Sequence, residues 1–151
     1  MIDDVSASAL PTMRKWLHAV LWLGFAGTGV ELVLMSHYED GWQIVPLALI
    51  GAALVTLFSL SAGRGAAILR VFRAVMVLCI AAGLLGVGLH FKGAAEFQRE
   101  LDPSQGTWSL TRKVMRVKAP PVLAPGLMAQ LGLLGLIFGY RHPSEPGSEE
   151  E

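Results

Sequence analysis

Four stretches of the chain consist almost entirely of apolar residues, and polar segments separate them. They cover residues 16–35, 42–61, 70–91 and 121–140. A helix needs about 20 mostly apolar residues to cross the roughly 30 Å hydrocarbon core of a bilayer. Surface helices of a water-soluble protein carry a polar face, which these stretches lack. The pattern predicts an all-α integral membrane protein, a four-helix transmembrane bundle with one longer extramembrane loop, 92–120, between helices 3 and 4.

The two ends of the chain differ from this core in composition. Residues 1–15 read as a polar N-terminal tail, 16–140 as the membrane domain and 141–151 as an acidic tail. The acidic tail contains two prolines, and its composition predicts disorder. The first apolar stretch is longer than the apolar region of a signal peptide, and no small-residue cleavage site follows Met35. We therefore expect an uncleaved first span.

Composition narrows the class of protein further. Hydrophobic residues make up 53% of the 151 residues and charged residues 16%, against roughly a quarter charged in an average soluble domain. Twelve basic and twelve acidic residues cancel, which argues against a nucleic-acid binder. Cys79 is the single cysteine, so an intramolecular disulfide and a multi-cysteine metal site are excluded. No nucleophile elbow, phosphate-binding glycine loop or HExxH motif occurs, so we expect a non-enzymatic protein.

The number of lysine and arginine residues on the two sides does not decide the orientation of the chain in the membrane. With the N-terminus inside, each side of the membrane receives six of these residues. The first connection, 36–41, has no Lys or Arg, and the first span usually has the largest influence on topology. We therefore expect a bacterial-type inner membrane location with both termini in the cytoplasm.

Small residues form stripes along three of the predicted helices. Such stripes let membrane helices approach closely, and at 100° per residue they predict the packed faces. Glu31 and His90 lie on these stripes, so both are expected to point into the bundle. The stripes are Val20, Gly24, Gly27, Thr28, Glu31 and Met35 in the first helix, Cys79, Ala82, Gly83, Gly86, His90 and Gly93 in the third, and Met128, Gly132, Gly135 and Gly139 in the fourth.

Ionisable side chains are predicted to gather at the end where the first and third helices leave the membrane. They are Glu31, His37, His90 and Glu96, with Glu100 as a possible addition. One interpretation is a structural Glu–His pair or simple polar crowding. A second is a site for a divalent transition metal, because imidazole and carboxylate ligands suit such ions. A third is a proton- or ion-binding pair, Glu31 and His90, because an ionisable group within a span is expensive and often functional.

One position resembles a known family. A glutamate within the first of four short helices, here Glu31, is similar to the small multidrug-resistance transporters. That resemblance implies proton-coupled transport through Glu31. It covers this single position, and the long connection 92–120 departs from the short loops of that family.

The connection 92–120 has its own pattern. Residues 93–101 read as a helical continuation of the third span. Further on, Leu110, Val114 and Val117 recur at helical spacing among basic residues, which predicts a short amphipathic segment that contacts anionic headgroups. A solvated charged loop is the equal alternative. The basic residues are Arg112, Lys113, Arg116 and Lys118.

Together these features favour a small accessory or scaffold subunit of a membrane complex. Its partners would be the lipid bilayer and either further copies of itself, as a homo-oligomer, or other membrane subunits, with no nucleic acid. Two alternatives stay open: a small proton- or ion-coupled transporter that uses Glu31 and His90, and a metal-binding membrane protein.

Overall fold

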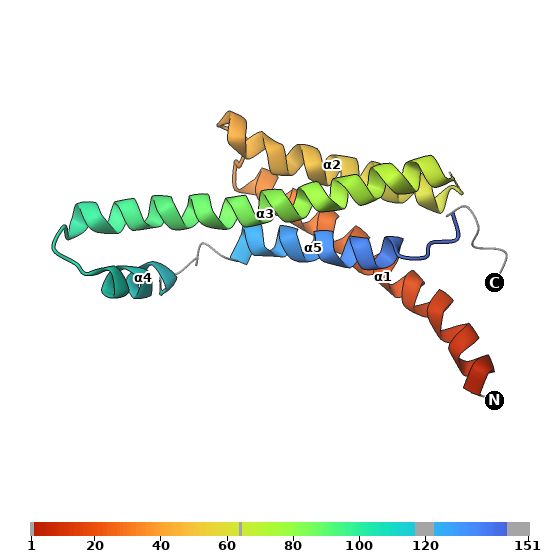
Figure 1. Ribbon diagram of the computed structural model, residues 1–151. Coiled ribbons are helices and arrows are strands. Elements are labelled where there is room, and N and C mark those ends of the chain that lie inside the picture. Colours follow the sequence, from red (N-terminus) through yellow and green to blue (C-terminus); the bar gives the residue numbers. More distant parts are fainter. Residues whose placement is uncertain (1, 64, 117–122, 145–151) are drawn as a thin grey trace.

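The computed structural model consists of helices joined by turns, with no strand among the residues it describes (Figure 1). These are 2–63, 65–116 and 123–144, with side chains from residue 9 onward. The all-α class predicted from the sequence is confirmed. The helices are α1 (Ile2–Leu34), α2 (Gly41–Ser61), α3 (Ala66–Leu101), α4 (Thr107–Met115) and α5 (Leu123–Gly139).

Three of the helices in the described residues are long and apolar enough to cross a membrane. The segments are Ala9–Leu34, Gly41–Ser61 and Ala66–Leu101. Helix α5 is equally apolar but has 17 residues, so it is about 26 Å long at 1.5 Å per residue. The predicted fourth span, 121–140, is therefore longer than the helix observed there, and its first two residues lie outside the described part.

Two predicted boundaries need correction. The segment 1–15 is not a separate tail, because α1 begins at Ile2 and runs through Pro11 without a break. The segment 92–120 is not a plain loop. The expected helical continuation is confirmed, since α3 runs to Leu101, and α4 follows after a short turn. Residues 117–122 and the predicted acidic tail from 145 onward lie outside the described residues.

Helices α1, α2, α3 and α5 pack as a ring in which each helix contacts two neighbours. The contacting pairs are α1 with α2, α2 with α3, α3 with α5, and α5 with α1. Neighbouring helices of the ring run in opposite directions, as Figure 1 shows. One hydrophobic core fills the centre of the ring, and Phe25, Leu57, Phe72 and Met76 in it are fully buried.

The closest approach in the bundle is between α3 and α5, where the predicted small-residue stripes face each other. A Cβ added at Gly83 would lie 2.6 Å from the backbone N of Ala129, and one added at Gly132 would lie 2.7 Å from the carbonyl O of Met76. Only hydrogen fits at these two positions. Cys79, Gly83, Gly132, Gly135 and Gly139 are all buried, so the stripes predict this interface correctly.

The stripe predicted for the first helix is only partly right. Thr28 is buried and a Cβ added at Gly24 would meet Leu131, but Val20, Gly27, Glu31 and Met35 are exposed. Helix α1 packs through Leu21, Phe25 and Thr28, all buried, whereas Glu31 is exposed and a Cβ at Gly27 would meet nothing within 4 Å. The packed face is turned by roughly a quarter of a turn from the predicted one. The physical reason is that two large side chains, Leu21 and Phe25, fill the space between the neighbouring helices better than the small residues beside them.

Candidate functional site

At the end of the bundle where α1 and α3 leave it, only part of the predicted polar cluster forms. The rings of His37 and His90 stack, with centroids 6.2 Å apart and planes 21° apart. Glu31 is exposed on the outer side of α1. Glu96 pairs with Lys92 at 3.8 Å on the surface of α3, and Glu100 is exposed further along the same helix.

The predicted metal site is not formed by these residues. Nowhere in the described residues do three His, Cys, Asp or Glu side chains come close enough to hold a metal ion. The first reason is the orientation of α1, which turns Glu31 away from the bundle. The second is length, because Glu96 lies six residues beyond His90, about 9 Å further along the helix. The expectation that Glu31 and His90 point into the bundle is also wrong, since both are exposed.

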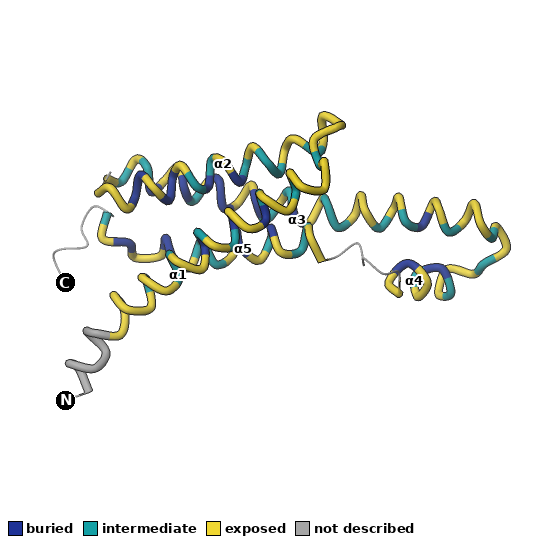
Figure 2. Tube along the Cα trace, turned by 180° about the vertical axis from the view of Figure 1, so that it is seen from behind, coloured by how far each residue is buried: buried dark blue, intermediate teal, exposed yellow. Residues whose placement is uncertain are grey.

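Beyond the bundle, α3 and α4 form a helical hairpin with a small core of its own (Figure 2). Ala95 of α3 and Leu110 and Val114 of α4 are buried together, and Phe91 and Ala94 pack against them. Val114 is fully buried. The predicted apolar face of α4 therefore packs on α3, and the basic side chains Arg112, Lys113 and Arg116 are exposed. Lys118 lies outside the described residues.

The turn of the hairpin is organised by Asp102, which follows the last residue of α3. Its Oδ1 accepts hydrogen bonds from the hydroxyl of Ser104 at 2.7 Å and from the backbone N–H of Ser104 at 3.2 Å. Its Oδ2 lies 3.5 Å from Nζ of Lys113 on α4. The bonds from Ser104, and then the charge of Lys113, lower the pKa of Asp102 below its ordinary value, because they favour the carboxylate.

The hydrogen bonds to Asp102 in the hairpin turn are expected to persist to a lower pH than those of an aspartate with an ordinary pKa. The pKa of Asp102 is lower in the folded protein than the ordinary value of 3.8. Its contribution to the stability of the fold is therefore complete above pH 3.8 and is lost as the pH falls through the folded pKa. The amide proton shift of Ser104, followed by NMR, should titrate with a midpoint below 3.8. Asp102→Asn is expected to abolish this titration. A midpoint at or above the ordinary value would contradict the assignment.

At the opposite end of the bundle, two arginines hold the C-terminus of α5. Nη2 of Arg73, on α3, donates to the carbonyl O of Gly139 at 2.6 Å. Nη2 of Arg14, on α1, donates to the carbonyl O of Arg141 at 2.9 Å and to that of Tyr140 at 3.4 Å. The last carbonyls of a helix have no partner within it, and cations there also suit the helix dipole. These arginines therefore tie three helices together.

Loss of the Arg73 bond is expected to destabilise the bundle. We expect Arg73→Gln to lower the free energy of unfolding by about 1–2 kcal/mol, because a charge-assisted hydrogen bond to a helix end is lost. Denaturant titration in mild detergent, followed by circular dichroism, measures the change. Arg70→Gln is the control, since Arg70 is exposed on the same helix. Equal midpoints for the two variants would contradict the role of Arg73.

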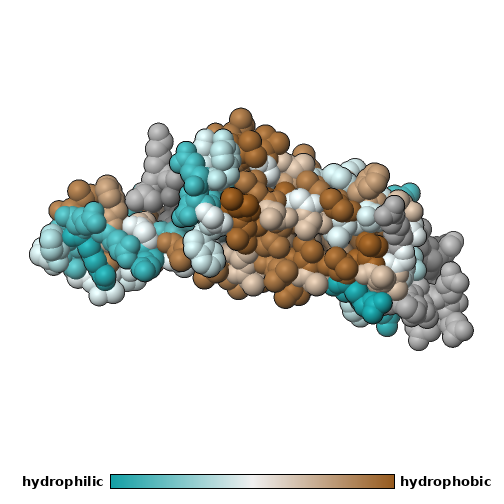
Figure 3. Space-filling view, turned by 90° about the horizontal axis from the view of Figure 1, so that it is seen from above, coloured by the Kyte–Doolittle hydropathy of each residue, from teal (hydrophilic) through white to brown (hydrophobic). Residues whose placement is uncertain are grey.

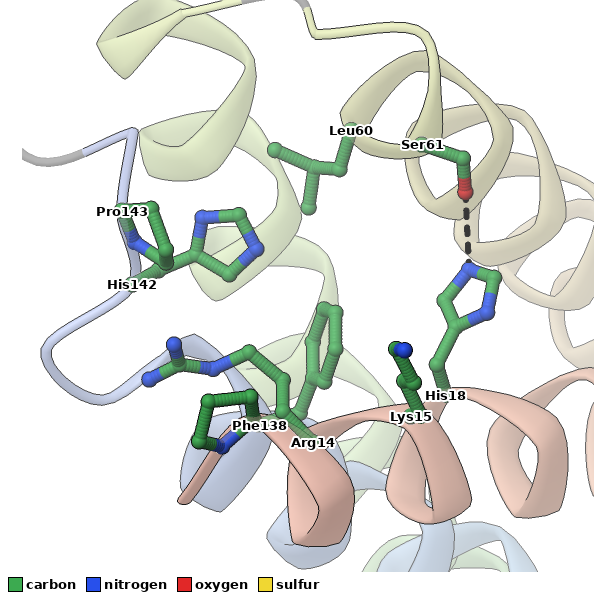
Figure 4. A pocket seen from close by; sticks show the side chains of 9 residues that line it. Arg14, Lys15, His18, Leu60, Ser61, Phe138, His142 and Pro143 are labelled. Carbon is green, nitrogen blue, oxygen red and sulfur yellow. Dashed lines mark hydrogen bonds between the residues drawn. The ribbon is translucent and has the colours of Figure 1, made fainter. Parts of the chain in front are cut away.

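The same end of the bundle contains an open depression of about 400 Å³ (Figure 4). It lies between the start of α1, the end of α2 and the segment that follows α5. Two cationic residues, two histidines and a serine contribute its polar groups, and Leu60 and Phe138 are buried at its base. The lining residues are Pro11, Arg14, Lys15, His18, Leu60, Ser61, Phe138, His142 and Pro143.

The first histidine of the depression, His18, is fixed by two neighbours. Its Nε2 accepts a hydrogen bond from Nε1–H of Trp22 at 3.2 Å and lies 2.8 Å from the hydroxyl of Ser61 (Figure 4). An indole N–H can only donate, so Nε2 is the acceptor and the neutral ring carries its proton on Nδ1. The ring of His18, on α1, thereby contacts the end of α2.

The second histidine, His142, is 8% exposed although it follows the last helix. Its Nδ1 accepts a hydrogen bond from the backbone N–H of Ser144 at 3.2 Å. The ring of Phe138 lies between the two histidines, 5.7 Å from His18 and 5.2 Å from His142, centroid to centroid. Sequence patterns do not find this group. Its one signal is the concentration of basic and histidine residues around the start of the first apolar stretch and just after the last one.

Comparison with protein-family models, with curated proteins and with solved structures finds no match for this chain. Its function is therefore inferred from the geometry of its own residues.

Proposed function

We propose that this chain is a multi-pass integral membrane protein that crosses the bilayer through α1, α2, α3 and α5 and serves as a non-enzymatic accessory subunit of a membrane complex. Its surface supports the membrane location. The face in Figure 3 is largely hydrophobic over the middle of the molecule, and hydrophilic side chains gather toward the ends. Leu23, Val55, Leu84 and Ile137, one on each of the four helices, are at least 60% exposed. Lipid solvates such side chains, whereas water opposes their exposure.

The observation that carries the accessory role is the hairpin of α3 and α4. Helix α3 continues without a break for ten residues beyond Phe91, about 15 Å, and α4 packs on this extension. The hairpin exposes large apolar side chains outside the apolar stretch: Phe97 is 58% exposed, Leu101 66% and Trp108 78%. Contiguous exposed apolar patches mark contact sites. Phe97 and Leu101 lie one helical turn apart on one face of α3, and tryptophan is enriched at the centre of protein interfaces.

We assign these three residues, Phe97, Leu101 and Trp108, as the hairpin contact surface, and an extramembrane region of another membrane subunit as its partner. A helical hairpin with its own core presents this surface rigidly, which lowers the entropy cost of binding.

The core of the bundle favours this role over transport. Leu21, Phe25, Leu57, Phe72 and Met76 fill the described centre of the ring with fully buried apolar side chains. Glu31 and His90, the predicted proton-binding pair, lie exposed at its outer surface. A transport pathway requires ionisable groups that face the bundle interior or water, so a single copy offers no support for the transporter alternative.

For the orientation, we propose that the end with the depression faces the cytoplasm. Arg14 and Lys15 precede the first apolar stretch at this end, whereas the first connection at the other end, 36–41, has no Lys or Arg. The charges beside the first span usually have the largest influence on topology. Both described ends of the chain are then cytoplasmic, and the hairpin lies on the opposite side of the membrane.

Site-specific photocrosslinking in native membranes tests the accessory role. A photoreactive residue at Phe97, Leu101 or Trp108 is expected to give one discrete protein adduct. The same residue at Ile137, which faces lipid in this proposal, is expected to give none. An adduct of twice the chain mass would identify the partner as a second copy. Absence of an adduct at all three hairpin positions, or identical adducts at Ile137, would contradict the proposal.

A further inference from the structure

We propose that the depression at the Arg14 end of the bundle binds the phosphate group of an anionic phospholipid headgroup. This binding is separate from the contact made by the hairpin and does not depend on a protein partner. It assigns a ligand to a group of residues that the accessory role leaves unused.

The charges around the depression favour an anion. Arg14 and Lys15 line it, and Arg73 and Arg141 lie at the same end. The acidic residues whose side chains are described all lie at the other end of the bundle or on the hairpin: Glu31, Glu39, Asp40, Glu96, Glu100 and Asp102. Positive charge is therefore not offset by the described carboxylates at this end, and a cleft lined by charges of one sign concentrates counter-ions.

Hydrogen-bond donors are positioned for a phosphate. Arg14 is held in place by its two bonds to the end of α5, both from Nη2, and a guanidinium offers five N–H donors in a fixed plane. Lys15, the next residue of α1, also lines the depression, and Figure 4 shows the Arg14 guanidinium near Pro143 and the Lys15 side chain near His18. Arginine and lysine together are the usual ligands of phosphate groups.

The position of the depression favours a lipid over a free anion. Its walls include Leu60 and Phe138, which suit the glycerol and upper acyl region of a lipid. Trp16 and Tyr140 are 70% and 67% exposed at the same end, where interfacial aromatic residues of membrane helices lie. The depression is therefore at headgroup depth.

Native mass spectrometry of the full chain tests the proposal. The protein is reconstituted in nanodiscs of equal phosphatidylcholine and phosphatidylglycerol, transferred to mild detergent, and the lipids that remain bound are counted. Wild type is expected to retain phosphatidylglycerol about tenfold better than phosphatidylcholine. Lys15→Gln is expected to remove most of this preference, because one charge-assisted bond corresponds to about a tenfold change in affinity.

The matched control is Arg70→Gln, which removes one positive charge from the same end without altering the lining of the depression. It is expected to keep the wild-type preference. An equal loss in Lys15→Gln and Arg70→Gln would overturn the proposal, because it would show general attraction to a charged surface. Circular dichroism confirms that each variant is folded.

Two measurements on the wild-type protein distinguish binding of a phospholipid from binding of free phosphate or of a lipid without phosphate. Inorganic phosphate, added to the lipid-free protein in detergent, is expected to give less than a tenth of the binding seen with phosphatidylglycerol at equal concentration. A fatty acid of matched chain length, which carries a charge but no phosphate, is expected to compete weakly. Equal binding of inorganic phosphate would overturn the lipid assignment, and equal binding of the fatty acid would overturn the phosphate assignment.

Discussion

Replacing Gly83 with alanine is expected to lower the free energy of unfolding by about 1–3 kcal/mol, the usual cost of overpacking a close-packed interior. The added Cβ would lie 2.6 Å from the backbone N of Ala129 and 2.6 Å from the carbonyl O of Pro125. Neither backbone atom can move by a change of rotamer, so α3 and α5 must separate along their interface. Gly83→Val is expected to have a larger effect.

Denaturant titration in mild detergent, followed by helical circular dichroism, measures this effect. Gly88→Ala is the matched control on the same helix, because a Cβ there would meet nothing within 4 Å. This control is expected to be neutral or slightly stabilising, since alanine is the better helix former. Equal destabilisation by the two substitutions would mean that helix propensity, and not the approach of α3 to α5, decides the outcome.

Replacing Val114 with aspartate is expected to detach α4 from α3 and leave the bundle intact. Val114 is fully buried in the small core of the hairpin, and a buried unpaired carboxylate costs several kcal/mol. A core of three buried residues cannot absorb that cost. The bundle has a separate core, so local unfolding of the hairpin should leave it folded.

Hydrogen exchange in detergent distinguishes these regions. Backbone amides of α4 are expected to lose protection in Val114→Asp by at least a hundredfold, which follows from a cost of about 3 kcal/mol or more. Amides in the buried parts of α2 and α5 should keep their wild-type rates. Met115→Asp, at the 43% exposed neighbour, is the control and should change little. Loss of protection in both α4 and the bundle would show that the two cores fold as one unit.

The long apolar stretches were the most reliable guide in the sequence. They predicted α1, α2, α3 and α5, because hydrocarbon requires long uninterrupted apolar segments whose backbone bonds internally. The helical continuation 93–101 of α3 was predicted separately, from its own residues. The glycines of α3 and α5 predicted packed faces for an equally local reason. Gly83 and Gly132 each lie in a stripe of small residues at helical spacing, which allows close approach of another helix.

The ionisable cluster could not be predicted in the same way. Helix α1 has small residues on nearly opposite faces, Gly24 and Gly27 on one and Gly29 on the other. Its rotation depends on which side chains of α2 and α5 fill the space beside it. In the structure Gly24 faces Leu131 and Gly29 faces Ile50, and this rotation leaves Glu31 outside the bundle. No periodicity within α1 contains that information.

The sequence by itself determined the helical class, the apolar segments and the packed glycine faces of α3 and α5, because each follows from local composition and spacing. Only the tertiary structure decided that Arg14 and Arg73 bind the end of α5 and that Phe138 lies between His18 and His142. Apart from the neighbouring pair Phe138 and His142, these contacts join residues more than 60 positions apart, for example Arg73 and Gly139. They exist because the ring of helices brings α1 and α3 beside α5. The ring forms only when all four helices pack together, so no single helix sequence predicts these contacts.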